Sequence, residues 1–215
     1  MTDQPRKGPA YRVVTRLLFI RFWEPADAPL HLDALDPSQE HLRPWMPCAA
    51  GEPPTLEQEV GNVRHLRAQF DLGRDYVYGI LNRDETAVLG GSGLHARAGV
   101  PAAEAEALEI GYWIHVDHIN QGLATETSAA LTKVAFEING VERVEIHNDP
   151  KNARSAAVPR KLGYVQEAIL RQRTRNADGT PSDSMIWTIL RDEYPGSPAA
   201  QAEIEAFDAV GNRLL

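Results

Sequence analysis

The chain has 215 residues, of which 43% are hydrophobic and 24% are charged, a composition typical of a soluble globular protein with a sizeable core. A formal net charge of -8 argues against nucleic-acid binding, which needs a basic surface, and suits cationic substrates better. No stretch is apolar for long enough to span a bilayer and residues 1–7 lack the apolar core of a signal peptide, so we expect a cytoplasmic protein without membrane contacts.

The N-terminal half is predicted to alternate short strands with two helices. Thr55, with Gln58 three residues later, forms a capping box, and Gly73 ends the helix that it begins. Cys48, the single cysteine, lies in a proline-rich loop; it excludes an internal disulfide, and we interpret it as a packed or incidental thiol. In chain order the predicted elements are a loose lead (1–11), a strand (12–22), a helix from Pro25 that ends before Pro37, a helix from 56 to 72, and a hairpin with strands at 75–81 and 86–94.

Glycines interrupt the second strand of this hairpin at Gly90, Gly91 and Gly93. Glycine weakens a strand, and it often marks a β-bulge or a close approach of another group to the backbone. We therefore expect a bulge there, or substrate lying against that strand.

The C-terminal half is predicted to continue the sheet. The aromatic and β-branched residues Tyr112, Trp113, Ile114 and Val116 indicate a central strand, and the helical spacing of apolar residues from Leu123 indicates a helix that stops at Gly140. Further elements are a strand (141–147), a helix capped by Asn152, a hairpin (165–173 and 184–190) and a tail (195–215) with a short helix through Ile204 and Phe207. This order predicts an α/β (α+β) fold with a mixed sheet and helices on both faces. We expect one domain over 12–192 and an extension over 193–215 that docks on this domain or on a second subunit.

Between the central strand and the next helix lies the run Asn120-Gln121-Gly122-Leu123-Ala124-Thr125. Gly122 allows a ligand to approach the backbone, and the first amides of the helix then point outward at the positive end of the helix dipole. Such a turn is a natural phosphate site. Taken alone, the run is more typical of an ordinary connection with a glycine turn.

A second segment, His147 to Tyr164, contains Asn152, Ser155, Val158 and Lys161-Leu162-Gly163-Tyr164. Together the two segments resemble the GNAT superfamily of N-acetyltransferases. The first matches its acetyl-CoA pyrophosphate motif, and the second its Asn-x-x-Ser-x-x-Val-x-x-Lys-Leu-Gly-Tyr motif, which contacts the pantetheine arm and the adenosine end. The resemblance implies a mostly antiparallel sheet in which the central strand and the strand from Val141 splay apart to form the cleft for acetyl-CoA.

The segment from Leu42 to Pro47, Leu-Arg-Pro-Trp-Met-Pro, is similar to one in the RimJ/RimL-type branch of that superfamily, which acetylates protein N-termini. This similarity implies that Trp45 contacts the substrate. Alternatively, Trp45 plugs the core.

The resemblance also implies roles for individual residues. Glu109 is the candidate general base, acting directly or through a water, and Ser155 is the candidate that protonates or stabilises the departing thiolate. The alternatives are a salt-bridged glutamate at a strand end and a helix-start serine that bonds only to backbone. Asn148 is a candidate substrate contact. Acetyl-CoA, as co-substrate and without a metal, is expected to contact Ile114, His115, Val116, Gln121, Gly122, Leu123, Ala124, Thr125, Asn152, Arg154, Ser155 and Lys161.

The chain departs from the family pattern at three positions. Ile119 and Asn120 stand where glutamine or arginine and glycine are frequent, so the pyrophosphate loop is expected to sit differently. Pro159 stands where many members of the family have a tyrosine proposed as general acid, which leaves Ser155 or solvent as the candidate for that role. A proline there also frees the Ser155 carbonyl, at a cost of about 3 kcal/mol if nothing compensates.

These observations predict an acetyl-CoA-dependent N-acetyltransferase acting on a protein or peptide N-terminal amine. The alternatives are acetylation of a small amine, such as a polyamine, an amino acid or an aminoglycoside, and a binding module that holds acyl-CoA without turnover. The histidines His115, His118 and His147 are interpreted as packed or hydrogen-bonded groups, and no spacing indicates a metal site. A homodimer is compatible with the sequence.

Overall fold

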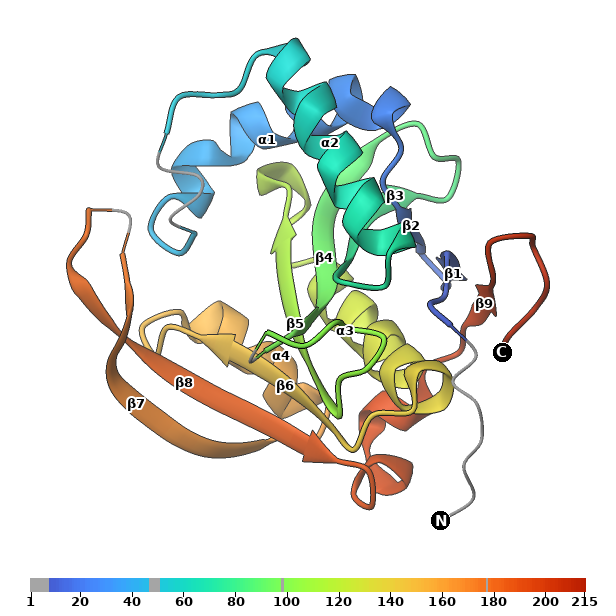
Figure 1. The fold of residues 1–215 in the computed structure, drawn as a ribbon. Coiled ribbons are helices and arrows are strands. Elements are labelled where there is room, and N and C mark those ends of the chain that lie inside the picture. The colour runs from blue at the N-terminus through green and yellow to red at the C-terminus, as the bar shows by residue number, and fades with distance from the viewer. Residues whose placement is uncertain (1–7, 47–50, 98, 177) are drawn as a thin grey trace.

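The computed structural model describes residues 8–46, 51–97, 99–176 and 178–215. The prediction for Cys48 lies outside these residues. Within them, nine strands form one sheet in the order β7-β8-β6-β5-β4-β3-β2-β1-β9, and β5 with β6 is its only parallel pair (Figure 1). The strands are β1 Arg12–Val14, β2 Leu18–Phe22, β3 Tyr76–Asn82, β4 Val88–Ala96, β5 Ala107–Ile114, β6 Arg143–Asn148, β7 Val165–Arg175, β8 Pro181–Leu190 and β9 Glu205–Phe207.

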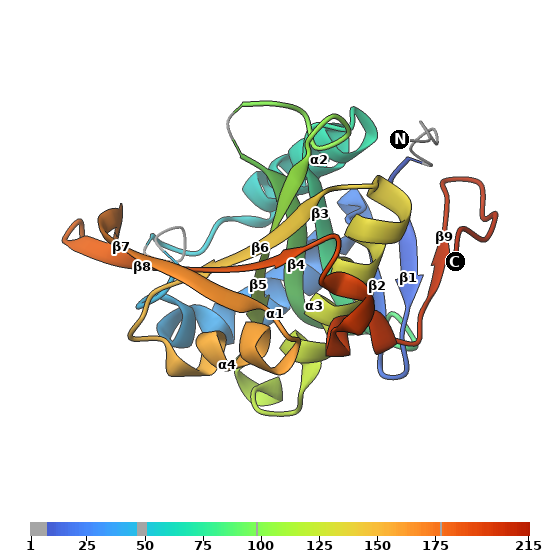
Figure 2. The ribbon, with the colours of Figure 1, turned by 90° about the horizontal axis from the view of Figure 1, so that it is seen from below.

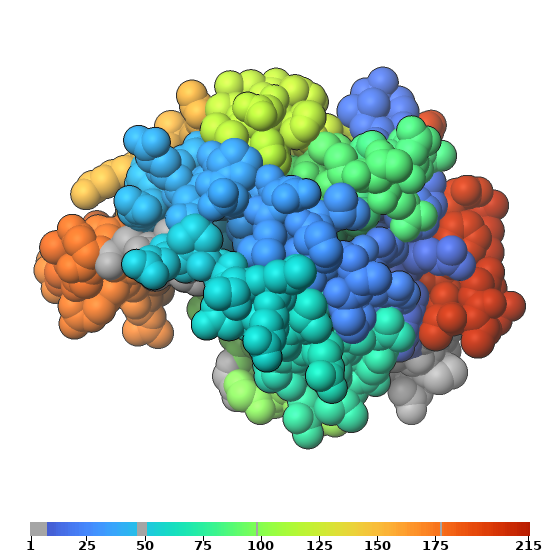
Figure 3. Space-filling model, turned by 90° about the horizontal axis from the view of Figure 1, so that it is seen from above, coloured from blue at the N-terminus to red at the C-terminus, as the bar shows by residue number. Residues whose placement is uncertain are grey.

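Helices cover both faces of the sheet, so the predicted fold class is confirmed (Figure 2). One face carries α1 and α2, and the other carries α3 and α4. Seen from above, α1 and α2 cover their side of the molecule and the β7–β8 hairpin extends beyond them (Figure 3). The bounds are α1 Ala28–Leu42, α2 Leu56–Asp71, α3 Leu123–Val134 and α4 Ala153–Lys161, with a π-helical turn at Ala135–Asn139 and 3-10 helices at Pro25–Asp27, Val116–His118, Tyr194–Gly196 and Pro198–Gln201.

The predicted helix caps are confirmed. Thr55 and Gln58 exchange both hydrogen bonds of a capping box, and Asn152 Oδ1 accepts from Ser155 N at 3.1 Å at the start of α4. Gly140 has a φ of 71° after the end of α3 and its π-helical turn. These features are local, so the sequence alone is enough to predict them.

The single strand predicted over 12–22 is wrong, because the structure forms the antiparallel hairpin β1–β2 there. Glu126, at the start of α3, accepts hydrogen bonds from Thr15 Oγ1 at 2.6 Å and from Leu17 N at 2.8 Å. A residue more than a hundred positions away therefore stabilises the turn between β1 and β2, and no local sequence pattern predicts this contact.

The prediction that α1 ends before Pro37 is also wrong, since the helix continues to Leu42. Proline cannot donate to the carbonyl of Asp33, but both residues are exposed, so water can satisfy that carbonyl. Ala34 and Ser38 face the protein interior, and Ser38 Oγ donates to Ala34 O at 2.7 Å within the helix. As a result α1 extends toward the end of the sheet where β5 finishes.

The two ends of the described chain meet at one edge of the sheet. Residues 204–207 do not form the expected helix; β9 pairs with β1 instead, with Val13 opposite Ala206. The lead is not loose from residue 8 onward, because Ala10 is fully buried and Tyr11 N donates to Phe207 O at 2.8 Å. The tail therefore docks on this domain, where it covers an edge strand.

β5 and β6 diverge after three residue pairs, as predicted. Their register ends at Glu109 opposite Glu145, although β5 continues to Ile114 and β6 to Asn148. The divergence leaves backbone groups of β5 without a partner strand, beside the start of α4. No helix in the described part of the chain is long and apolar enough to cross a membrane.

Candidate active site

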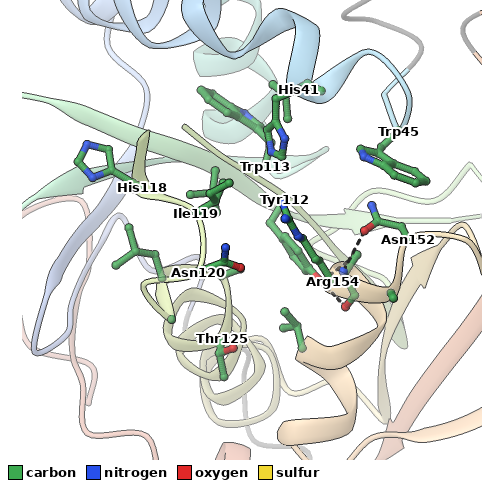
Figure 4. Close-up of a pocket in the computed structure, with 18 of the residues that line it drawn as sticks. His41, Trp45, Tyr112, Trp113, His118, Ile119, Asn120, Thr125, Asn152 and Arg154 are labelled. Atoms are coloured by element: carbon green, nitrogen blue, oxygen red, sulfur yellow. Dashed lines mark hydrogen bonds between the residues drawn. The ribbon is translucent and has the colours of Figure 1, made fainter. Parts of the chain in front are cut away.

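A pocket of about 510 Å³ lies where β5 and β6 diverge, between the end of α1 and the first turns of α3 and α4 (Figure 4). It brings together segments that are far apart in the sequence. Of the predicted residues, the following line it: Trp45, Ile114, Gly122, Leu123, Ala124, Thr125, Asn152, Arg154, Ser155 and Lys161. Those that do not line it are Glu109, His115, Val116, Gln121 and Asn148.

The loop before α3 presents backbone donors to this pocket. Asn120 and Gly122 have φ values of 62° and 84°, and the first intrahelical bond of α3 runs from Glu126 N to Gly122 O at 3.0 Å. The amides of residues 123–125 therefore precede the hydrogen-bond ladder and remain available to a ligand. Asparagine tolerates the left-handed conformation better than most residues, which explains how it can stand where the family often has glycine.

Basic side chains surround the same region despite the acidic net charge. Lys151, Arg154 and Lys161 line the pocket and are exposed. His41, from the last turn of α1, also lines it, and its pKa is lowered by burial and by the charge of Arg154. Cations beside unpaired amides at a helix N-terminus form a suitable site for a phosphorylated ligand.

Of the three predicted acetyl-CoA contacts at the end of β5, which are Ile114, His115 and Val116, one has a backbone amide that is available to a ligand. His115 N donates to Leu89 O at 2.8 Å and Val116 N donates to Ser38 Oγ at 3.1 Å, so neither is free for a ligand. Val116 also lies in a 3-10 turn, not in the strand where we expected it. Because alternate residues of an antiparallel strand bond to the same neighbour, the N–H of Ile114 points away from β4, toward the gap beside β6.

Ser155 and Tyr112 form a hydrogen-bonded pair in the pocket. The Tyr112 hydroxyl donates to Ser155 O at 3.1 Å and lies 3.0 Å from Ser155 Oγ. It therefore satisfies the carbonyl that Pro159 leaves without an intrahelical donor. Burial raises the pKa of Tyr112 to about 12. Tyr112 was predicted as a residue of the central strand but not as a site residue, although the strand alternation places it on the same face as Ile110 and Ile114.

Glu109 lies outside the pocket, on the opposite side of β5 from Tyr112. Its side chain is 16% exposed and forms an ion pair with Arg97, so a salt bridge of the kind that the alternative interpretation expected is present. His147 Nδ1 lies 4.0 Å from its carboxylate, and His147 Nε2 lies 2.8 Å from Glu145 Oε2. Hydrogen bonds from His147 and Arg143 lower the pKa of Glu145 to about 2.

The two predicted substrate contacts occupy different environments. Trp45 lines the pocket with 40% of its surface exposed, so the interpretation that it plugs the core is wrong. Asn148 Oδ1 accepts from Trp187 Nε1 at 3.2 Å, whereas its Nδ2 is buried and has no partner among the described residues. A second hollow of about 840 Å³ shares Trp45 and Lys151 with the pocket and reaches Asn176, after β7.

The glycines of β4 make room for side chains of the protein. A Cβ on Gly91 would lie 2.4 Å from Trp113 Nε1, and a Cβ on Gly93 would lie 2.3 Å from His95 Nε2. Packing against these rings accounts for both glycines without a bound substrate. The expected β-bulge is present beside Gly90: Ile80 pairs with Gly90 and Leu81 with Val88, so Leu89 is the extra residue on β4. No group of three or more potential metal ligands occurs in the described ranges.

Comparison with known proteins agrees with this geometry. Residues 16–165 match the family model described as the acetyltransferase (GNAT) domain, so the chain belongs to the GNAT acetyltransferase family and is an acetyltransferase. It is 28% identical over 137 residues to the uncharacterized N-acetyltransferase YoaA of Bacillus subtilis, an alignment that covers 64% of this chain and 75% of YoaA.

Solved structures with the same fold include two ribosomal-protein acetyltransferases. RimL, the ribosomal L7/L12 alpha-N-protein acetyltransferase in complex with coenzyme A, superimposes with a TM-score of 0.73 at 18% identity and covers 84% of this chain and 97% of RimL. The ribosomal-protein-S5-alanine acetyltransferase from Vibrio fischeri gives a TM-score of 0.74 at 17% identity, over 85% of this chain and 98% of that protein. At these identities the likeness concerns the fold.

Proposed function

We propose that this protein is an acetyl-CoA-dependent N-acetyltransferase of the RimJ/RimL type, in which a protein or peptide N-terminal amine attacks the thioester directly. The observation that carries the proposal is the pocket that joins the loop at Gly122, the start of α4 at Ser155, and Trp45. Three remote segments converge where the sheet opens. The proposal also draws on membership of the GNAT family. A cytoplasmic location and a homodimer stay predictions.

The residues present fit acetyl-CoA as a co-substrate. The amides of residues 123–125 would hold the pyrophosphate, with Arg154 and Lys161 supplying positive charge beside it. The free N–H of Ile114 would donate to the thioester oxygen, where negative charge develops during attack. Acetyl-CoA supplies the activated acetyl group, and these residues bind and orient it.

For proton transfer we propose Glu109 as the general base that takes a proton from the amine, directly or through a water. The carboxylate forms an ion pair with Arg97, and the partly buried His147 lies 4.0 Å from it. A base of this kind would reach the amine from the side of the sheet opposite the pocket. Ser155 would donate a hydrogen bond to the departing sulfur.

The second hollow favours a peptide as the acceptor. It extends from Trp45 to Asn176, and so continues the pocket toward the β7–β8 hairpin, where a chain longer than a small amine can lie. The predicted contact between Asn148 and the substrate stays a proposal: its Nδ2 has no hydrogen-bond partner among the described residues, although that atom is buried and Asn148 lines neither hollow. RimL and the S5-alanine enzyme, which have the same fold, act on ribosomal proteins according to their names.

The test is thiol release from acetyl-CoA with a panel of peptides that carry free N-termini and with polyamines, amino acids and aminoglycosides. We expect turnover with peptides and a loss of at least about tenfold in kcat for Glu109→Gln and for Ser155→Ala. Glu57→Gln, in the exposed first turn of α2, is the matched control, and its kcat should equal that of the wild type. Turnover with small amines alone would assign the acceptor to that class. CoA binding without turnover on any amine would refute the enzyme in favour of an acyl-CoA-binding module.

A further inference from the structure

The pairing of Tyr112 with Ser155 goes beyond what the family motifs describe. We propose that Tyr112 is a positioning residue that turns the Ser155 hydroxyl toward the sulfur of the departing thiolate. This inference rests on the proposed function, since the thiolate arises only if acetyl-CoA is the acyl donor. It assigns a role in the reaction to a strand residue, at a site where Pro159 removes the donor that a helix normally provides.

The geometry around Ser155 leaves the tyrosine hydroxyl with two acceptors and one hydrogen. Ser155 N is already bound to Asn152 Oδ1 at 3.1 Å, and Pro159 has no N–H for the Ser155 carbonyl four residues earlier. The Tyr112 oxygen lies 3.1 Å from that carbonyl oxygen and 3.0 Å from Ser155 Oγ. Its hydrogen can therefore bond to one or the other.

Each choice fixes where the serine hydrogen points. When Tyr112 donates to the carbonyl, the Ser155 hydroxyl can donate back to the tyrosine oxygen. When Tyr112 donates to Ser155 Oγ, the serine hydrogen is turned away from the tyrosine and into the pocket, which both residues line. Negative charge on a sulfur in the pocket favours the second arrangement, because hydrogen bonds in a chain polarise and strengthen one another.

In this proposal Tyr112 and Ser155 contribute hydrogen bonds, and neither residue transfers a proton. During the reaction a C–N bond forms at the acetyl carbon and the C–S bond breaks. The acceptor ammonium loses one proton to the general base before its nitrogen attacks, and the second proton, which the nitrogen loses after the C–N bond forms, ends on the sulfur. Burial keeps the pKa of Tyr112 high, at about 12, so the phenol stays protonated and keeps its hydrogen for donation at neutral pH.

The experiment separates this role from a purely structural one. Tyr112→Phe removes the hydroxyl, so it leaves the Ser155 carbonyl unbonded and the serine hydroxyl undirected. Pro159→Ala restores an N–H that can satisfy the carbonyl. We expect Tyr112→Phe to lower both Tm and kcat, with kcat falling about tenfold. In Tyr112→Phe/Pro159→Ala we expect Tm to recover while kcat stays low and the Kd for CoA stays within about twofold of the wild-type value.

Two further measurements test whether Tyr112 acts through Ser155. Tyr112→Phe/Ser155→Ala should be no slower than Ser155→Ala alone, because residues acting as a unit are not additive. The thiol of bound CoA, followed by thiolate absorbance, should titrate at a higher pH in Tyr112→Phe than in the wild type. Tyr194→Phe removes another hydroxyl that is hydrogen-bonded, at 2.6 Å to Glu137, and should change Tm without changing kcat or the thiol titration.

The outcomes distinguish this inference from the proposed function. Recovery of kcat by Pro159→Ala in the Tyr112→Phe background, additive losses with Ser155→Ala, or an unchanged thiol titration would each overturn the role of Tyr112 while the enzyme remains an acetyltransferase. Absence of turnover by the wild-type protein with every amine would refute the proposed function and, with it, any role at the thiolate.

Discussion

Replacing Gly122 by alanine tests whether the start of α3 holds the cofactor phosphates. Gly122 has a φ of 84°, and a Cβ built on it would meet no heavy atom within 4 Å. The substitution therefore causes no clash with the rest of the protein. Its cost is the left-handed conformation itself, about 1–2 kcal/mol for a residue with a Cβ.

This cost should appear in ligand binding. In the free protein the loop can relax away from the strained conformation, which moves the amides of residues 123–125 out of position. Binding must then restore that conformation, so the affinity for CoA should fall by about 5–30-fold. Isothermal titration calorimetry with CoA measures this loss, and thermal unfolding of the free protein measures how much of the strain remains without ligand.

Gly211→Ala is the matched control. Gly211 has a φ of 86° and its Cβ would meet only Arg12 Nη2, at 3.6 Å, in the turn after β9, outside the residues that line the pocket. It should change Tm and leave the affinity for CoA within about twofold. If Gly122→Ala also leaves the affinity within that range, the amides at the start of α3 do not hold the ligand and the assignment of this loop fails.

Two further predictions concern stability. Gly91→Ala places a Cβ 2.4 Å from Trp113 Nε1 and should destabilise the protein by about 1–3 kcal/mol in urea unfolding. The control is Gly61→Ala, in open space on α2, which should be neutral or stabilising. Equal effects of the two substitutions would contradict the packing argument. The pKa of Glu145 is lowered from 4.5 to about 2, so its ionised form stabilises the fold above pH 4.5 and that stability, up to about 3 kcal/mol, disappears as the pH falls toward 2. The free energy of unfolding of Glu145→Gln should therefore fall less steeply than that of the wild type over this range, and parallel profiles would show that Glu145 does not carry this dependence.

Much of the candidate site was predictable because its parts are local. The loop from Asn120 to Thr125 and the cap at Asn152 depend on residues within a few positions of one another, and the structure places both at the pocket. Trp45 was predicted only as one of two alternatives. Its position at the pocket depends on α1 continuing through Pro37, against the preference of proline itself.

Glu109 illustrates the opposite case. Its position in the strand was predicted nearly correctly, but of its neighbours Arg97 directly follows β4 and His147 lies in β6. Strand pairing brings them together, and the sequence carries no signal for the register of that pairing. The same reason explains why Tyr112 was missed: its partner Ser155 lies 43 positions away.

The sequence by itself determined the family, the helix caps and the glycine turn before α3, since each depends on residue types at short and fixed spacing. Only the tertiary structure decided that β1 and β2 form a hairpin, that β9 closes the sheet edge, and that Tyr112 satisfies the carbonyl freed by Pro159. These features depend on contacts between distant segments, whose free energy outweighs the local preferences that a sequence displays.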